Sequence, residues 1–365
     1  MIDYSKLSED AMMQYIRQIQ EVLQGLLDHR KVNTEAFVRL FKERKFRRVL
    51  ITGSGTSYHC GESARPFMEE VLGIPVSAEY PRVVENSLIN IGDETVAFAI
   101  SQSGESKSTI DAINYLKDKG VCIVSLSENA KGHTMASLAD LSLSLGCGEE
   151  LAGPKTKGYE ASIFSLMLLA MEAAYETDRI CEKGYTDYVA RMQKTIDNIP
   201  NVISASEEWY ERNAEELMEA KRLIVIGYGS NYGDVLEGRL KLSEAIRFGV
   251  EGYELEEFMH GIYHSINEDV QLFYLSPEGK YKQRSFRLKN FLNDYSHHEY
   301  AIGNFAGMEG VTSKDLNTYF VDDPSFCCLE YIIPMQILAY RLSKDKGINA
   351  NIPKIPNFHH LMGSK

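Results

Sequence analysis

The chain has 365 residues, of which 52 are acidic and 39 basic, giving a formal net charge of −13 at pH 7. This balance argues against a nucleic-acid-binding protein, since such a protein needs a basic face. No apolar run reaches the roughly 20 residues of a membrane span, and the N-terminus lacks the pattern of a signal peptide. We therefore expect a cytoplasmic protein that binds neither nucleic acid nor membrane.

An amphipathic helix is predicted from Ser8 to about Leu27. Ser8 can cap this helix, and the acidic Glu9 and Asp10 suit its first turn, where the helix dipole favours negative charge. Its apolar residues fall on one stripe at helical spacing: Met12, Ile16, Ile19, Leu23 and Leu26. Residues 1–44 are therefore expected to form an N-terminal helical segment.

Strand and helix patterns then alternate through residues 45–177. Strands are predicted at 47–53, 74–80, 95–101, 121–127 and 138–145, with helices at 59–72, 109–119 and 162–175. Strands separated by helices predict a parallel, doubly wound sheet. The polar helical pattern of residues 178–206 contains no strand and is expected to connect this lobe to a second one.

The strand pattern restarts as a repeat. RRVLITGSGTS resembles KRLIVIGYGSN, with Gly55 and Gly229 lying 174 residues apart, and FAISQSG resembles FYLSPEG at an offset of 175. Chance similarity between buried strands is the alternative, but two loci at almost one offset favour a duplicated unit. The sequence thus predicts an α/β protein with two tandem doubly wound parallel-sheet lobes, flavodoxin-like in type, the second covering 207–345 and followed by a tail over 346–365.

Small hydroxyl residues follow two of the predicted strands. SQSGESKST (101–109) carries five hydroxyls, and GSGTS (53–57) is a second such turn. At the carboxyl ends of parallel strands, free helix N–H groups favour an anion, and glycine and serine let the backbone approach it closely. Helix capping alone is the alternative explanation. Neither turn is a Walker loop or a GxGxxG fingerprint.

Four motifs, in order, resemble the sugar isomerase (SIS) domain family. They are GSGTSYHCGE, FAISQSGESKST, CGEELAGPKTKGYEAS and GYGSNYGDVLEGRLKLSEA, and EEFMHG extends the likeness. The family includes the isomerase half of glucosamine-6-phosphate synthase and deglycases of fructosamine 6-phosphate and glucoselysine 6-phosphate. The resemblance covers about residues 45–360 and implies a double-SIS protein acting on a phosphorylated sugar or sugar-amine.

The resemblance also implies site residues. The phosphate site carried over is Ser57, Ser101, Gln102, Ser103 and Ser106. Other substrate-binding positions are Gly55, Thr56, Lys155, Lys241 and His360. No metal or cofactor is expected, because the six cysteines are scattered and form no CxxC pair.

Catalysis is expected from two residues of the second lobe. Glu237, Lys241 and Glu244 share one helix face at i, i+4 and i+7, which by itself is most simply a solvated charged face. The resemblance makes Glu244 the catalytic base and His260 the acid for proton transfer between C1 and C2 of the sugar. In several relatives this histidine comes from the neighbouring subunit, so a homodimer or higher homo-oligomer with a shared active site is expected.

The sequence does not decide the roles of two further segments. Glutamates cluster before His260, at 251, 254, 256 and 257, where they either meet a cationic amine or form a solvated acidic turn. The tail NIPKIPNFHHLMGSK is either frayed or, as in relatives, closes over the sugar site. Lys354, His359, His360 and Lys365 are its basic residues, and which of them enters the site stays open.

Among SIS proteins the sequence favours an enzyme over a silent sugar-phosphate-binding regulator, because both Glu244 and His260 are present. No glutaminase domain or helix-turn-helix domain is expected ahead of residue 45. The double-SIS form and the tail favour a deglycase that releases a hexose 6-phosphate and a free amino acid from an Amadori-type product. An aldose–ketose phosphosugar isomerase is the alternative within the enzymes.

Overall fold

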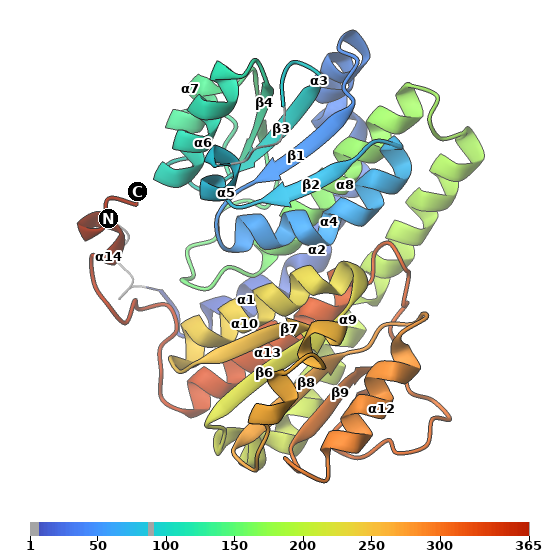
Figure 1. Ribbon diagram of the computed structural model, residues 1–365, viewed down its shortest axis with the longest axis vertical. Helices are drawn as coiled ribbons and strands as arrows, with labels where there is room; N and C mark the ends of the chain where they lie inside the picture. The colour runs from blue at the N-terminus through green and yellow to red at the C-terminus, as the bar shows by residue number, and fades with distance from the viewer. Residues whose placement is uncertain (1–6, 87–90, 365) are drawn as a thin grey trace. The chain divides into compact units, whose positions relative to one another are not determined.

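The computed structural model describes residues 7–86 and 91–364. The described chain divides into two compact units. We call residues 21–150, 157–190 and 355–364 the first lobe, and residues 7–20, 151–156 and 191–354 the second lobe. Each lobe contains one five-stranded sheet (Figure 1).

The first lobe is built on a wholly parallel sheet. Its strands are β1 (Arg48–Thr52), β2 (Val76–Glu79), β3 (Thr95–Ile100), β4 (Cys122–Ser127) and β5 (Leu141–Ser144), in the order β2-β1-β3-β4-β5. Its helices include α3 (Arg30–Glu43), α4 (Thr56–Leu72), α5 (Pro81–Glu85), α6 (Lys107–Asp118), α7 (Thr134–Leu138), α8 (Lys157–Glu176) and α14 (Phe358–Leu361). The predicted doubly wound sheet is confirmed.

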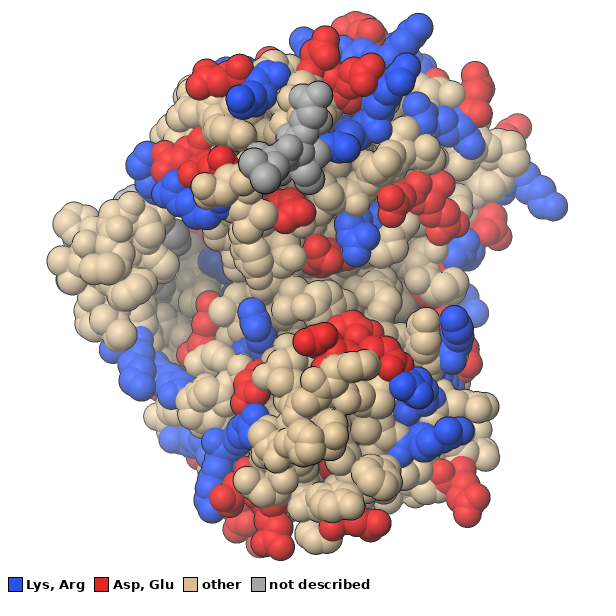
Figure 2. Space-filling view, viewed as in Figure 1, with Lys and Arg blue, Asp and Glu red and all other residues tan. Residues whose placement is uncertain are grey.

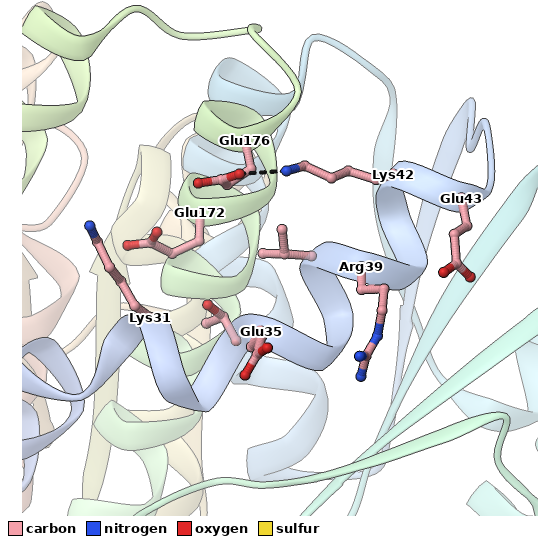
Figure 3. Close-up of a pocket in the computed structure, with 9 residues that line it drawn as sticks. Lys31, Glu35, Arg39, Lys42, Glu43, Glu172 and Glu176 are labelled. Atoms are coloured by element: carbon pink, nitrogen blue, oxygen red, sulfur yellow. Dashed lines mark hydrogen bonds and ion pairs between the residues drawn. The ribbon is translucent and has the colours of Figure 1, made fainter.

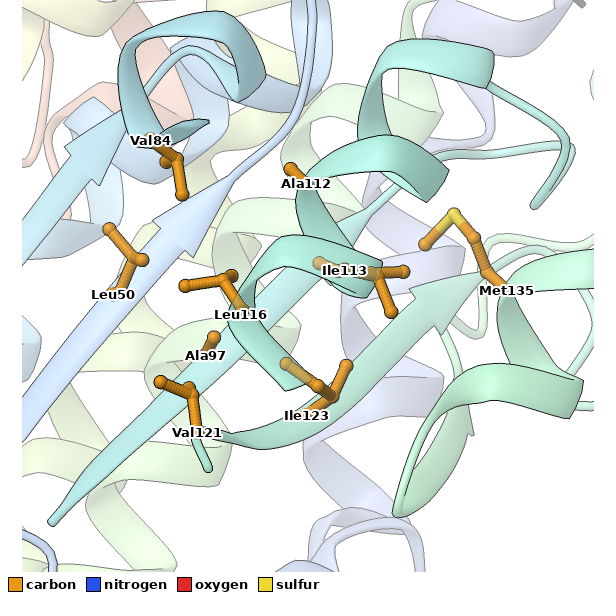
Figure 4. Packing of buried hydrophobic residues seen from close by; sticks show 10 residues of the cluster. Leu50, Val84, Ala97, Ala112, Ile113, Leu116, Val121, Ile123 and Met135 are labelled. Carbon is orange, nitrogen blue, oxygen red and sulfur yellow. The ribbon is translucent and has the colours of Figure 1, made fainter. Parts of the chain in front are cut away.

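Helices cover both faces of this sheet because alternate side chains of its strands point to opposite sides. Ala97 lies in one cluster with Ile113 and Leu116 of α6, as Figure 4 shows. Its neighbour Phe98 faces the other way and meets Phe37 of α3, with ring centroids 5.1 Å apart. Both faces of β3 are therefore buried, as its continuous apolar run predicts.

The N-terminal helix differs from the prediction. In place of one helix from Ser8 to Leu27 there are α1 (Ala11–Arg17) and α2 (Ile19–Asp28), separated at Gln18. Ser8 is not the N-cap, because α1 begins only at Ala11, although the Ser8 hydroxyl accepts from the Asp10 amide at 3.2 Å. The predicted apolar stripe is confirmed, since all five of its residues are buried.

The second lobe repeats the topology of the first. Its strands are β6 (Arg222–Gly227), β7 (Val250–Glu254), β8 (Val270–Leu275), β9 (Glu299–Gly303) and β10 (Leu316–Asn317), in the order β10-β9-β8-β6-β7 and all parallel. Its helices include α10 (Tyr232–Ile246), α11 (Leu255–Phe258), α12 (Lys282–Leu292) and α13 (Cys328–Asp345). The order is that of the first lobe when β6 is set against β1, which agrees with the predicted duplication.

The long helix α9 (Glu182–Met218) takes up most of the polar helical segment and continues beyond it to Met218. Within the second lobe it packs Trp209 edge-on against Phe273 of β8 and Tyr300 of β9. The indole N–H donates to the Lys314 carbonyl at 2.7 Å. This single tryptophan of the chain therefore reports on the core of the second lobe.

Surface charges of both signs are interspersed on the face shown in Figure 2. No described helix is both long enough and apolar enough to cross a membrane.

A buried carboxyl links α9 to α13 inside the second lobe. Glu330 accepts from the Asn198 side chain at 2.7 Å and from the Val321 amide at 3.1 Å. Burial nevertheless raises the pKa of Glu330 to about 7 from its ordinary 4.5. A carboxyl whose pKa is raised by folding contributes stability that is complete below the unfolded pKa and is lost as pH rises through the folded one.

We therefore predict that the second lobe loses stability as the pH rises from about 5 to about 7.5, and that Glu330→Gln flattens this dependence. Glu299, whose pKa burial also raises to about 7, contributes in the same direction. Denaturant unfolding followed by Trp209 fluorescence at several pH values measures the effect, with the exposed Glu309→Gln as control. An unchanged pH slope in Glu330→Gln would contradict the assignment.

Candidate functional site

The two hydroxyl turns lie at the carboxyl ends of β1 and β3, which are adjacent in the first-lobe sheet (Figure 1). From β1 the chain leads to β2 on one side, and from β3 it leads to β4 on the other. This reversal of strand order is the switch point at which open α/β sheets bind ligands. Ser57 lies in the first turn of α4, and residues 101–106 connect β3 to α6.

Glycine is required where the two turns approach each other. A Cβ on Gly53 would lie 2.6 Å from the Ser57 Cβ and 2.8 Å from the Ile100 carbonyl oxygen. Gly55 starts α4 with φ 58° and ψ −128°, a conformation that L side chains rarely adopt. The Ser54 and Ser108 hydroxyls, 3.1 Å apart, join the turns. The sheet thus brings both predicted turns into one constellation.

Several hydroxyls of this constellation are not used by the fold. Those of Ser57 and Ser101 make no hydrogen bond to any residue in the described part of the chain. The Ser103 hydroxyl accepts only from the Glu105 amide, at 3.3 Å. Ser106 stands at the N-cap of α6 but makes no side-chain capping bond; its hydroxyl accepts from Thr109 at 3.2 Å and lies 3.4 Å from the Ser108 hydroxyl. Capping therefore does not explain these residues, and their O–H groups can donate to an anion.

Two residues that the sequence analysis did not assign support the loop. Ser108 bridges to Ser54, and Glu128 accepts from the Gln102 side-chain amide at 3.5 Å. Ser108 is one of the five hydroxyls of the SQSGESKST stretch, so a signal existed in the sequence. Glu128 lies beyond the next strand, and its role depends on the β3–β4 pairing, which sequence spacing alone does not give.

The expectation of a solvated Glu–Lys–Glu face on α10 is wrong. Lys241 and Glu237 are fully buried, with Lys241 Nζ 3.4 Å from Glu237 Oε1. The same ammonium lies 2.6 Å from Oε2 of Glu244, whose side chain is 40% exposed. A buried lysine thus fixes one oxygen of an accessible carboxylate, which is a suitable arrangement for a general base.

His260 is exposed in the turn that follows α11. Its Nδ1 lies 2.7 Å from the Glu256 carbonyl, so Nδ1 carries a proton and donates it. Among the described residues no hydrogen bond or ion pair joins His260 to Glu244. Topology explains this separation: α10 returns to the amino edge of the sheet, where Glu244 lies near its end, whereas His260 follows the carboxyl end of β7.

Most carboxylates of the acidic cluster before His260 have protein partners, which argues against a solvated acidic turn. Residues 250–254 form β7, where Glu251 pairs with Arg222 at 2.6 Å. Glu254 caps α11 by accepting from the Glu256 amide at 2.7 Å. Glu256 pairs with Arg284. These charges stabilise the fold locally, and Glu257 is the member of the four left exposed.

The C-terminal tail reaches the start of α6 in the first lobe. The Ser364 carbonyl accepts from the Lys107 amide at 3.2 Å, in the first turn of α6. His359 Nδ1 lies 2.9 Å from the Ser364 hydroxyl, while His360 is exposed on the short helix α14. Lys155 is half-buried in the 151–156 segment, which belongs to the second lobe.

A cavity of about 480 Å³ lies between α3 and α8, and none of the predicted site residues lines it (Figure 3). Charged side chains of both signs line it, and Lys42 pairs with Glu176 across it. The buried Glu172 accepts from the Tyr185 hydroxyl at 2.7 Å. Two of its carboxylates, Glu172 and Glu176, thus have protein partners.

Comparisons with known proteins decide the family. A family model described as the SIS domain matches residues 43–172. A Clostridium difficile 630 structure described as a candidate phosphosugar isomerase is 31% identical, with a TM-score of 0.90 over 97% of this chain and 98% of that one. The chain belongs to the SIS domain family. A Salmonella typhimurium LT2 structure described as a candidate sugar-binding protein is 33% identical, with a TM-score of 0.80 over 90% of this chain and 99% of that one.

Curated relatives of this SIS protein are longer than the chain. A glutamine–fructose-6-phosphate aminotransferase of Aquifex aeolicus is 27% identical over 86% of this chain and 52% of its own length. The second human enzyme of that name is 26% identical over 91% of this chain and 47% of its own length. The chain spans about half the length of the curated relatives it matches.

In this SIS protein, Ser101→Ala with Ser103→Ala should weaken the binding of a hexose 6-phosphate. A hydrogen bond to a charged group contributes about 1.5–3 kcal/mol, so each lost hydroxyl should cost roughly ten- to hundredfold in affinity and the double variant about a hundredfold or more. Isothermal titration with fructose 6-phosphate measures this affinity. The exposed Ser313→Ala in the second lobe is the control. Equal affinity in the double variant and the control would show that Ser101 and Ser103 do not bind the phosphate.

Proposed function

We propose that the protein is a deglycase of amino-acid-modified sugar phosphates, which releases a hexose 6-phosphate and a free amino acid. The observation that carries the proposal is the group of uncommitted hydroxyls at the β1–β3 switch point, which suits a phosphate. Family membership supports a phosphorylated sugar as substrate. Ser57, Ser101, Gln102, Ser103 and Ser106 are the proposed phosphate ligands, with Gly55 and Thr56 lining the turn.

The proposed chemistry is a proton transfer followed by hydrolysis. Glu244 removes the proton at the sugar carbon, and Lys241, 2.6 Å from its Oε2, holds the carboxylate in place. In the open-chain sugar, protonated His260 gives its Nε2 proton to the C2 carbonyl oxygen as Glu244 takes the C1 proton, so that an enolamine forms. The protonated Glu244 then returns a proton to C2 and His260 recovers its proton from the nitrogen, which gives an imine. Water splits the imine into the hexose 6-phosphate and the amine.

The position of His260 favours a homodimer. Within one chain, β7 and α11 separate Glu244 from the turn that carries His260, and a five-residue strand alone spans about 16 Å. The base and the acid must each lie within hydrogen-bond reach of neighbouring atoms of one sugar, so the two side chains must be close together. We therefore propose that the His260 that serves a given Glu244 belongs to a second copy of the chain, so that the active site is shared.

The alternative enzyme is an aldose–ketose phosphosugar isomerase, which needs the same base, acid and phosphate ligands and omits only the hydrolysis. A non-catalytic regulator would need the phosphate ligands alone. The accessible Glu244, oriented by a buried lysine, favours an enzyme over a regulator. Lys155 and His360 remain proposed substrate contacts.

Glu244→Gln should abolish turnover and leave phosphate binding intact, because the amide keeps the shape of the carboxylate and removes its basicity. Glucose 6-phosphate release from fructoselysine 6-phosphate and glucoselysine 6-phosphate measures turnover, and fructose 6-phosphate titration measures binding. The exposed Glu268→Gln is the control. Turnover equal to wild type in Glu244→Gln would exclude Glu244 as the base.

Mixing two inactive variants tests the shared site. If His260 acts on the partner's substrate, co-expressed Glu244→Gln and His260→Ala chains should recover part of the wild-type activity, because each mixed dimer contains one intact site. Each variant alone should remain inactive. No recovery, in a sample shown to contain mixed dimers, would place both residues of a site on one chain.

A further inference from the structure

The backbone on both sides of Ser103 is held by the segment that follows β4. The Glu128 amide donates to the Gln102 carbonyl at 2.9 Å, and the Met135 amide donates to the Gly104 carbonyl at 3.1 Å. Ser103, one of the proposed phosphate ligands, thus lies between two anchored peptide groups. The shape of the loop is therefore set by residues outside the motif that carries it.

His133 is fixed within that segment by both ring nitrogens. Its Nδ1 accepts from the Ala136 amide at 3.1 Å and so caps α7. Its Nε2 lies 2.6 Å from the Ser127 hydroxyl and 2.8 Å from the Asn129 carbonyl. Because a carbonyl only accepts and Nδ1 is already an acceptor, the proton is on Nε2. The ring therefore has one orientation.

This ring lies directly against the phosphate loop at Gly104. A Cβ on Gly104 would come within 2.0 Å of His133 Nδ1 and 2.3 Å of its Cγ. Gly104 also has φ +67°. Because Gly104 has no side chain, the imidazole ring of His133 can pack directly against the backbone of the turn.

Glu105 provides a second link to the same place. Its two carboxylate oxygens accept from the Thr134 amide at 2.8 Å and from the Thr134 hydroxyl at 2.7 Å. Two successive loop residues, Gly104 and Glu105, thus contact the first turn of α7 and its capping histidine. The loop and the start of α7 behave as one packed unit.

We infer that His133 is a positioning residue for the phosphate loop, which holds Ser101 and Ser103 in the geometry that binds the phosphate of the substrate while touching no substrate itself. The inference rests on the proposed function, because it takes these hydroxyls as the phosphate ligands. It adds a residue that lies outside the SIS motifs noted above.

A double-mutant cycle between His133 and Gly104 tests this role. Gly104→Ala in the wild-type background should weaken fructose 6-phosphate binding strongly, because the added methyl group meets the ring. In a His133→Ala background the same substitution should cost much less, since only the backbone strain remains. Gly120→Ala is the matched control: Gly120 has φ +78° and nothing within 4 Å of its Cβ position.

His133→Ala alone should weaken binding about tenfold, a size typical of coupling between residues in contact, and should raise KM with little change in kcat. His133→Asn is the second variant, since asparagine can still cap α7 but lacks the ring under Gly104. It should keep the wild-type Tm and still bind the sugar phosphate weakly.

The outcomes separate the inference from the proposed function. Wild-type affinity in His133→Asn, or a Gly104→Ala cost equal in both backgrounds, overturns the positioning role if Ser101→Ala with Ser103→Ala still loses affinity. If that double variant also binds normally, the phosphate site itself is wrong and the inference falls with it. Weak binding by His133→Asn together with strong coupling to Gly104 supports the role.

Discussion

The parallel pairing of β1 with β3 is the constraint on which the proposed site depends. It sets Thr52 beside Ala99, so that the chain leaves both strands at the same edge of the sheet. The two turns that follow can share one space only because Gly53 has no side chain, given the positions of Ile100 and Ser57. Hydroxyl groups and helix N-termini are thereby gathered at one place with little formal charge, which suits a phosphate.

The two lobes share a strand order but differ in the chemistry of the equivalent turns. At the carboxyl ends of β6 and β8, the Tyr228 hydroxyl donates to the Pro277 carbonyl at 2.6 Å, and Ser276 and Ser285 hydroxyls lie 2.8 Å apart. Lys282 pairs with Glu278 there at 2.6 Å. These polar groups form hydrogen bonds and ion pairs within the protein. The second lobe instead presents the Lys241–Glu244 pair on α10, which is consistent with copies of one unit that have taken different roles.

Much of the fold could be predicted because local sequence determines it. Buried strands such as β3 and β4 are continuous apolar runs, and α10 carries the predicted helical spacing of Glu237, Lys241 and Glu244. The break at Gln18 could not be read from the apolar stripe, which continues through it. Strand β7 was not predicted, because its glutamates are typical of a solvated turn. The structure shows that Arg222, on the neighbouring strand β6, pairs with Glu251.

The candidate site shows the same limit. Spacing alone placed Glu237, Lys241 and Glu244 on one helix face, but whether that face is solvated depends on tertiary packing. The packing buries Lys241 completely and leaves Glu244 accessible. Likewise, the hydroxyl-rich loop was visible in sequence, whereas its support by His133 depends on a Gly104 contact that no spacing rule gives. Motifs thus indicated the proposed ligands, and only the fold indicated what holds them.

The central claim is that the switch point of the first lobe binds the phosphate of the substrate. A crystal structure of the protein with fructose 6-phosphate tests it most directly. We expect phosphate oxygens within hydrogen-bond distance of the Ser57 and Ser101 hydroxyls, at the carboxyl ends of β1 and β3. A phosphate bound instead in the α3–α8 cavity, or at the carboxyl ends of β6 and β8, would contradict it.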